Sequence, residues 1–111
     1  MPGNNSHQIQ DQLPYTLEIT EKCRKKLTKM CKKDSVLQSS IETFLQNLTT
    51  EPYLGDKLEV NFPGMRSIHF HGNKYRIIYQ LYDEAKIITV MIVAHRKEAY
   101  AELAKWLHQG K

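Results

Sequence analysis

Arginine and histidine side chains lie among apolar residues in the second half of the chain, where they could form a charged binding or catalytic site. Arg76 lies within the run 74–82, which is otherwise rich in aromatic and β-branched residues. The planar fork of arginine binds two oxygens of a phosphate group at once, although the same side chain can also form a surface ion pair. His69 precedes this run, and histidine takes up and releases protons near neutral pH. The two residues therefore have the types that phosphate binding and proton transfer need.

A second group of polar residues follows an almost unbroken apolar run over 86–94. Such a run predicts a strand that is buried on both faces in the middle of a sheet. His95, Arg96 and Lys97 come directly after it, so we expect them to be held at a rigid edge. Two candidates also have purely structural interpretations, because His95 can cap the strand end and Tyr100 fits the apolar stripe of the next helix.

A metal site has weak support. His69 and His71 share one face of a predicted strand, as two zinc ligands could, but the sequence offers no third ligand. It also lacks a glycine-rich phosphate loop, a CxxC pair, an HExxH motif and a GxSxG motif. We therefore expect neither a metal nor a cofactor.

Strands are predicted where apolar and polar residues alternate. The segment 15–19 is a first strand, and 65–71 and 74–82 are two more, joined by the two-residue turn signal Gly72-Asn73. In the strand 74–82, alternation places Arg76 opposite the face that carries the tyrosines at positions 75 and 79. The apolar run over 86–94 completes an antiparallel meander. The loop 55–64 contains alternating apolar residues at 58, 60 and 62, which form either a brief strand or an extended lid.

Helices are predicted where apolar residues recur at helical spacing. Thr20 can cap a first helix whose stripe contains Cys23 and Leu27, and whose opposite face is rich in lysine. That lysine face is either an ordinary solvated surface or a surface that meets phosphates. A capping box at Ser35 starts a second helix, so the two form a helical hairpin on one sheet face. Lys97 to His108 form the last helix.

The order of elements predicts an α+β domain, β-α-α-β-β-β-α, with a mainly antiparallel sheet of about four strands. The length of 111 residues suits one domain, which we place over 13–111 after a disordered lead-in over 1–12. The formal net charge of +4 favours an anionic partner, either nucleic acid or an acidic protein segment.

The two cysteines indicate a reducing compartment. Cys23 and Cys31 would lie about 12 Å apart along one helix, too far for a disulfide. The sequence shows neither a signal peptide nor an apolar run of about 18 residues. We expect a cytoplasmic protein that does not contact a membrane.

The ordered set of motifs over 15–107 resembles the RelE/ParE superfamily of small toxins from bacterial and archaeal toxin–antitoxin pairs. The resemblance includes the helical hairpin and the segment 55–58. It also rests on the basic strand start 65–68, the run 75–79, the acidic turn 83–84, the strand end 94–96 and the helix start 98–100.

The resemblance implies one of two activities. RelE-like members cleave mRNA in the ribosomal A site without a metal, whereas ParE-like members bind DNA gyrase and cut nothing. In both branches an antitoxin segment covers the sheet and helices. We favour the mRNA-cleaving toxin, with a cognate antitoxin, the ribosome and mRNA as partners. The alternatives are a non-catalytic gyrase inhibitor and an interaction module that has lost its toxicity.

The resemblance also suggests roles for ten residues. The predicted catalytic residues are Arg76, His69, Arg96, Tyr100 and His95. The predicted RNA-binding residues are Lys74, Ser67, His71, Lys97 and Arg66. RelE itself has two lysines on the strand where this chain has Ser67 and His69, so either His69 replaces them or the nuclease chemistry is absent. Catalysis by this set requires His69 and Arg76 to share a sheet face.

Overall fold

The computed structural model describes residues 14–59 and 63–109. The expected lead-in over 1–12, and the positions Val60 and Phe62 in the predicted loop, lie outside these residues. The elements in chain order are β1 (Thr16–Ile19), α2 (Glu21–Cys31), α3 (Ser35–Thr50), β2 (Asp56–Lys57), β3 (Met65–Phe70), β4 (Tyr75–Tyr82), β5 (Ile87–His95) and α4 (Arg96–Gln109).

The predicted α+β class is confirmed, but the strand count of about four is too low. The described residues form one sheet of five strands in the order β1-β5-β4-β3-β2. The additional strand is β2, whose two residues pair antiparallel with β3. The sequence left a brief strand over 55–64 open on the apolar residues at 58, 60 and 62, but β2 lies just before them, at two residues that are too few to show alternation.

The strand pairing makes β5 an inner strand, as its apolar run predicted. It pairs parallel with β1 on one side and antiparallel with β4 on the other. The β4–β5 register shifts at Ile78/Tyr79, where Ile78 faces Ile92 and Tyr79 faces Val90. Met91 is therefore an extra residue in β5, which is the definition of a β-bulge.

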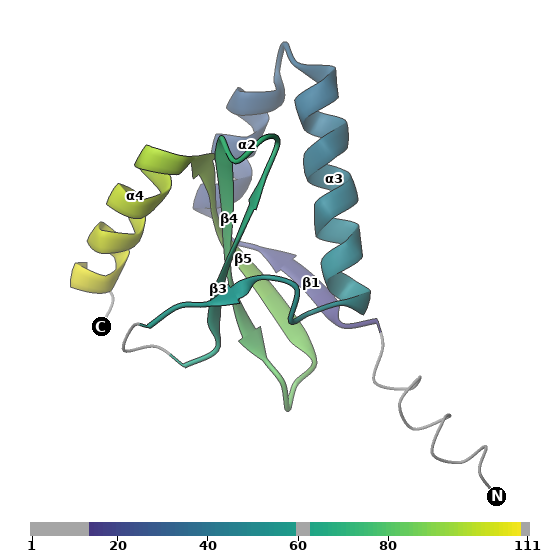
Figure 1. Ribbon diagram of the computed structural model, residues 1–111, viewed down its shortest axis with the longest axis vertical. Coiled ribbons are helices and arrows are strands. Elements are labelled where there is room, and N and C mark those ends of the chain that lie inside the picture. Colours follow the sequence, from purple (N-terminus) through teal and green to yellow (C-terminus); the bar gives the residue numbers. More distant parts are fainter. Residues whose placement is uncertain (1–13, 60–62, 110–111) are drawn as a thin grey trace, which may run out of the picture.

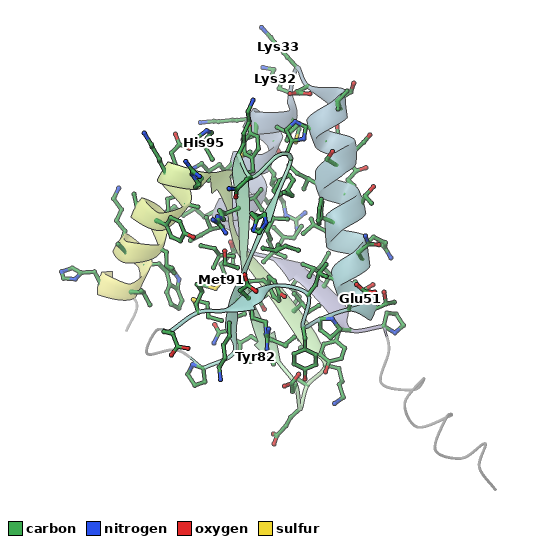
Figure 2. All side chains as sticks on the ribbon, in the orientation of Figure 1. Lys32, Lys33, Glu51, Tyr82, Met91 and His95 are labelled. Atoms are coloured by element: carbon green, nitrogen blue, oxygen red, sulfur yellow. The ribbon has the colours of Figure 1, made fainter. Side chains whose placement is uncertain are left out.

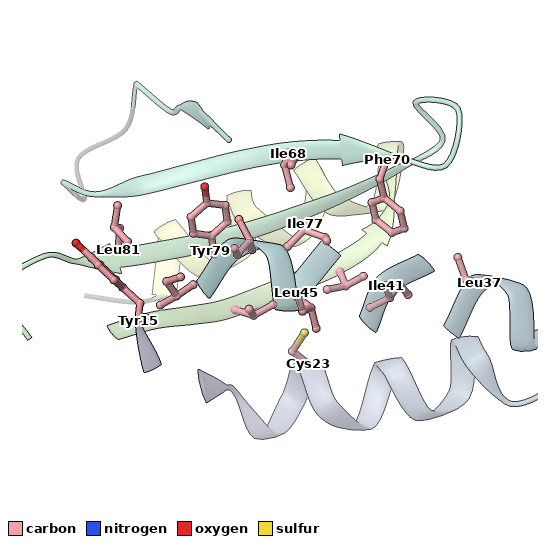
Figure 3. Packing of buried hydrophobic residues seen from close by; sticks show 14 residues of the cluster. Tyr15, Cys23, Leu37, Ile41, Leu45, Ile68, Phe70, Ile77, Tyr79 and Leu81 are labelled. Atoms are coloured by element: carbon pink, nitrogen blue, oxygen red, sulfur yellow. The ribbon is translucent and has the colours of Figure 1, made fainter. Parts of the chain in front are cut away.

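Helices cover both faces of the sheet (Figure 1). On one face, α2 and α3 pack through residues such as Cys23, Ile41 and Leu45 against Ile77 and Tyr79 of β4. Figure 3 shows this larger cluster from close by. On the other face, α4 packs against the sheet in a smaller cluster, formed by Met65, Ile78, Ile92, Ala94, Ala99 and Leu103. The predicted helical hairpin on one face is confirmed.

Side-chain caps set the helix starts. Thr20 accepts a hydrogen bond from the Cys23 N–H at 3.2 Å, as predicted. The cap of α3 is Asp34 rather than the predicted Ser35, because the Asp34 carboxylate accepts from the Leu37 N–H at 2.9 Å. Both aspartate and serine cap well, so the pattern alone could not choose between adjacent positions.

The turn between β3 and β4 has the geometry that its sequence predicts. Gly72 and Asn73 both have a φ of 67°, and the Lys74 N–H donates to the His71 carbonyl at 3.3 Å. Positive φ at both central residues is typical of the turns that close tight hairpins. The turn fixes the β3–β4 register, which places the candidate site residues.

Candidate active site

His69 and Arg76 share a sheet face. They are directly opposite each other in the β3–β4 register, and side chains of opposed residues in antiparallel strands point to the same side. That side is the one covered by α4, because Ile78, two residues after Arg76, packs beneath α4. The condition that the sequence left open is therefore met in the structure.

Arg76 also reaches the helix above it. Its guanidinium carbon lies 5.5 Å from the centre of the Tyr100 ring, within the range of a cation–π contact. Tyr100 is 44% exposed and does not belong to the buried stripe of α4. The structure therefore brings together His69, Arg76 and Tyr100, from β3, β4 and α4.

The Arg76 Nε atom is buried and has no hydrogen-bond partner among the described residues. An unsatisfied buried donor costs about 1–3 kcal/mol, and more when the group is charged. In this conformation the Nε is closed to solvent, so an anion would accept from this N–H only after the side chains that cover it have moved. This property distinguishes Arg76 from a surface arginine in an ordinary ion pair.

Ser67 lies on the same sheet face but is not accessible. It is 3% exposed, and its hydroxyl is also buried, with no partner in the part of the chain that the structure describes. Ser67 lies between Met65 and His69 on the face that α4 covers, so its predicted contact with RNA stays a prediction that this conformation does not display.

An ion-pair bridge holds α4 in position. Lys26 of α2 forms ion pairs with Glu102 and, at 4.0 Å, with Glu98. Both glutamates flank Tyr100 in the sequence of α4. Together with buried Ala99 and Leu103, the bridge fixes the helix that carries the tyrosine.

His95 and His71 do not join this cluster. His95 is opposite Tyr75 in the β4–β5 register, and the ring centres of the two residues are 5.8 Å apart. The His71 ring is also 5.8 Å from the Tyr75 ring. Tyr75 packs against the core formed with α2 and α3, so these three rings lie on the face away from Arg76.

Lys74 and Arg96 lie at the same end of the sheet as the hairpin turn. They line a cavity of about 190 Å³ with Gly72, Asn73 and His95. The Arg96 N–H donates to the Lys74 carbonyl at 2.8 Å, which ties the start of α4 to the turn. Lys97 follows in the first turn of α4 and is exposed. These cations surround the end of the sheet without touching Arg76 in any described contact.

Arg66 is engaged elsewhere. Its guanidinium donates to the Gly55 carbonyl at 2.6 Å and lies 5.0 Å from the centre of the Tyr53 ring. Alternation along β3 places it on the face opposite His69. Arg66 therefore holds the loop that precedes β2, and the structure does not bring it to the Arg76 cluster.

Several cations lie toward the end of the molecule where β5 stops, among them Lys74 and Arg96. Figure 2 shows Lys32 and Lys33, at the turn between α2 and α3, toward the end where His95 closes β5, whereas Glu51 and Tyr82 lie toward the other end.

Among the described residues, no group of three or more His, Cys, Asp or Glu side chains could hold a metal ion. The part of the chain that the structure describes contains no helix long and apolar enough to cross a membrane.

Comparison with known proteins identifies the family. The family model described as the ParE toxin of a type II toxin-antitoxin system, parDE, matches residues 17–100. Because the match spans most of the chain, the chain belongs to this family of toxins, within the RelE/ParE superfamily that its motifs resemble. No curated protein matches the chain.

Solved toxin structures share the fold. The isolated E. coli RelE toxin is 26% identical, with a TM-score of 0.62, over 82% of this chain and 96% of that chain. The toxin–antitoxin complex RelBE2 from Mycobacterium tuberculosis matches at 28% identity and a TM-score of 0.62, over 76% of this chain and 100% of that chain. An E. coli RelE mutant in complex with an antitoxin RelBc peptide is 25% identical, with a TM-score of 0.57, over 82% of this chain and 95% of that chain.

Proposed function

We propose that this toxin is a ribosome-dependent endoribonuclease that cleaves mRNA without a metal. The observation that carries the proposal is the buried, unpartnered Nε of Arg76, opposite His69 and beneath Tyr100. The E. coli RelE structure supports a RelE-like branch through its similar fold.

The reaction begins with the RNA itself. The 2′-hydroxyl oxygen attacks the adjacent phosphorus, a bond forms between them, and the bond from phosphorus to the 5′-oxygen breaks. The products are a 2′,3′-cyclic phosphate and a free 5′-hydroxyl. One group must take the proton of the 2′-hydroxyl and another must protonate the leaving oxygen, while a cation stabilises the charged phosphorane.

Arg76 supplies the cation in this reaction. Its fork can bind two phosphate oxygens, and its Nε is already positioned without a competing acceptor. His69 carries out one of the two proton transfers, because its Cα is about 5 Å from that of its cross-strand neighbour Arg76. Tyr100 holds the guanidinium through its ring and, being 44% exposed, can also orient a base.

An antitoxin is the proposed protein partner. The M. tuberculosis RelBE2 complex and the E. coli RelE complex with a RelBc peptide both contain an antitoxin. The basic end of this chain suits an acidic, amphipathic segment that folds on binding. Such a segment would compete with RNA for the cations around the hairpin turn.

The second candidate is a toxin that inhibits DNA gyrase. It is favoured by one observation, the ParE description of the matching family model. In that case the Arg76 cluster would be a binding surface rather than a catalytic site, and replacing His69 would weaken gyrase binding rather than any cleavage of RNA.

The test is cleavage of mRNA on programmed ribosomes. We expect Arg76→Ala to slow cleavage about 10²–10³-fold and His69→Ala about 10²–10⁴-fold. Arg76→Lys keeps the charge but loses the fork, so it should recover only part of the activity. His108→Ala, which removes an exposed histidine near the far end of α4, is the matched control and should cut like wild type. Wild-type protein that cuts nothing but blocks gyrase supercoiling would show that the second candidate is correct.

A further inference from the structure

A row of aromatic rings crosses the end of the sheet on the face away from Arg76. Phe70, Tyr75 and His95 are aligned in the registers of β3, β4 and β5. The ring centres of Phe70 and Tyr75 are 5.6 Å apart, and those of Tyr75 and His95 are 5.8 Å apart. His71, with a φ of 57°, returns its ring to within 5.8 Å of Tyr75.

One side of this row is buried, and the other side is exposed to solvent. Phe70 is 3% exposed and packs against Phe44 of α3, with ring centres 5.2 Å apart. His71 and His95 are exposed, and Tyr75 is half-buried between them. The His71 and His95 planes are inclined to the Tyr75 plane by 61° and 72°. An incoming base would therefore meet exposed rings that rest on aromatic side chains of the sheet.

Two cations adjoin this aromatic surface. Lys74 and Arg96 line the adjoining cavity of about 190 Å³ together with His95. Lys32 and Lys33 lie toward the same end of the molecule (Figure 2). Exposed rings bordered by positive charge are the combination by which proteins bind single-stranded nucleic acid, because rings stack on bases and cations attract the backbone.

We infer that His71, Tyr75 and His95 form a base-stacking platform for single-stranded RNA, separate from the cluster that would cleave it. The inference rests on the proposed function, and it gives His95 a binding role in place of the predicted catalytic one. The strand would pass across the end of the sheet, with one phosphate at Arg76 and a neighbouring nucleotide on the platform. The cavity beside Lys74 and Arg96 would receive the phosphate between these two points.

The platform can be tested without cleavage. The probe is a six-nucleotide RNA with 2′-O-methyl sugars, which lack the attacking hydroxyl, and with one 2-aminopurine, whose fluorescence falls when the base stacks. Titration at low salt strengthens the attraction of phosphate to cations. We expect fluorescence to fall when wild-type toxin is added, and a strand of the same length without bases to bind more weakly.

The variants separate stacking from charge. Tyr75→Leu and His71→Ala should each weaken binding about 5- to 100-fold and remove the fluorescence change, the range expected from loss of one stacked ring. His71→Phe, which keeps a ring but no charge or proton, should restore both. Tyr82→Leu is the matched control, because Tyr82 is 46% exposed, lies on the same strand as Tyr75 and points to the other face.

Each outcome decides one question. Equal affinity for the strands with and without bases, or an unchanged fluorescence response in Tyr75→Leu, would overturn the platform. A wild-type toxin that stacks the probe but cuts no mRNA on ribosomes would support the platform and overturn the proposed function. A toxin that cuts ribosome-bound mRNA without stacking the probe would support the proposed function and overturn the platform.

Discussion

Tyr79→Phe should destabilise the fold far more than the loss of one oxygen atom suggests. Tyr79 is fully buried in the centre of β4. Its hydroxyl accepts from the Gly55 N–H at 2.9 Å and donates to the Pro52 carbonyl at 2.9 Å. Burial raises the pKa of this hydroxyl, so it keeps the proton that the second bond needs.

The magnitude follows from the two groups that would be left without partners. Gly55 and Pro52 are both buried, and each unsatisfied buried backbone group costs about 1–3 kcal/mol. Taking the lower value for both, we expect a loss of about 2 kcal/mol in the free energy of unfolding. For a domain of this size that corresponds to a Tm lower by about 8–16 °C.

The assay is thermal and urea unfolding followed by circular dichroism. Tyr53→Phe is the control, because the hydroxyl of Tyr53 bonds to Asp83 at 2.7 Å but the side chain is 55% exposed. That variant should lose less than about 0.5 kcal/mol, as surface changes usually do. If Tyr79→Phe melted within about 3 °C of wild type, the argument that this hydroxyl holds the loop before β2 would be refuted.

Three other predictions concern this loop, the buried thiol and the antitoxin. A Cβ at Gly55 would lie 2.9 Å from both the Ser67 carbonyl oxygen and the Tyr79 hydroxyl, so Gly55→Ala should cost about 1–3 kcal/mol in urea unfolding. Gly72→Asn, at a positive φ in open space, should be nearly neutral. A larger loss of stability in Gly72→Asn than in Gly55→Ala would show that close packing at Gly55 does not limit this position. Burial raises the pKa of the Cys23 thiol from 9.0 to about 11. The stability that results from this shift is complete below pH 9 and declines as the pH rises toward 11, because the unfolded chain loses the proton first. Between pH 8 and pH 10.5 the urea concentration at the unfolding midpoint should therefore fall less in Cys23→Ala than in wild type. An equal fall in both proteins would show that the thiol has no such effect. Co-expression with a small acidic protein encoded beside this toxin should restore growth and raise the yield of soluble toxin; unchanged growth and yield would show that the neighbour is not its antitoxin.

The sequence predicted the large features of the fold because each depends on a long pattern. The apolar run over 86–94 predicted an inner strand, and β5 has a partner on either side. Alternation over 74–82 predicted that Arg76 faces away from Tyr75 and Tyr79, as it does. The two-residue strand β2 and the cap at Asp34 depend on one or two residues, for which no periodicity exists.

The candidate site was harder to predict because it depends on register between strands. The sequence identified His69, Arg76 and Tyr100 as candidates but could not show that they meet. It grouped His95 with them, although β4–β5 pairing places His95 beside Tyr75 on the other face. Ser67 was predicted to bind RNA from its place on the strand, but its burial depends on the packing of α4, an element distant in sequence.

Expression of the toxin in cells, followed by mapping of RNA ends and scoring of DNA damage, distinguishes cleavage of mRNA from inhibition of gyrase. We expect that translation stops and that mRNA is cut at codon boundaries in translated regions, with DNA intact. Arg76→Ala, expressed at the same level and equally folded, should leave the transcripts uncut. Intact transcripts together with DNA damage after expression of the wild-type toxin would contradict the account and identify a gyrase inhibitor.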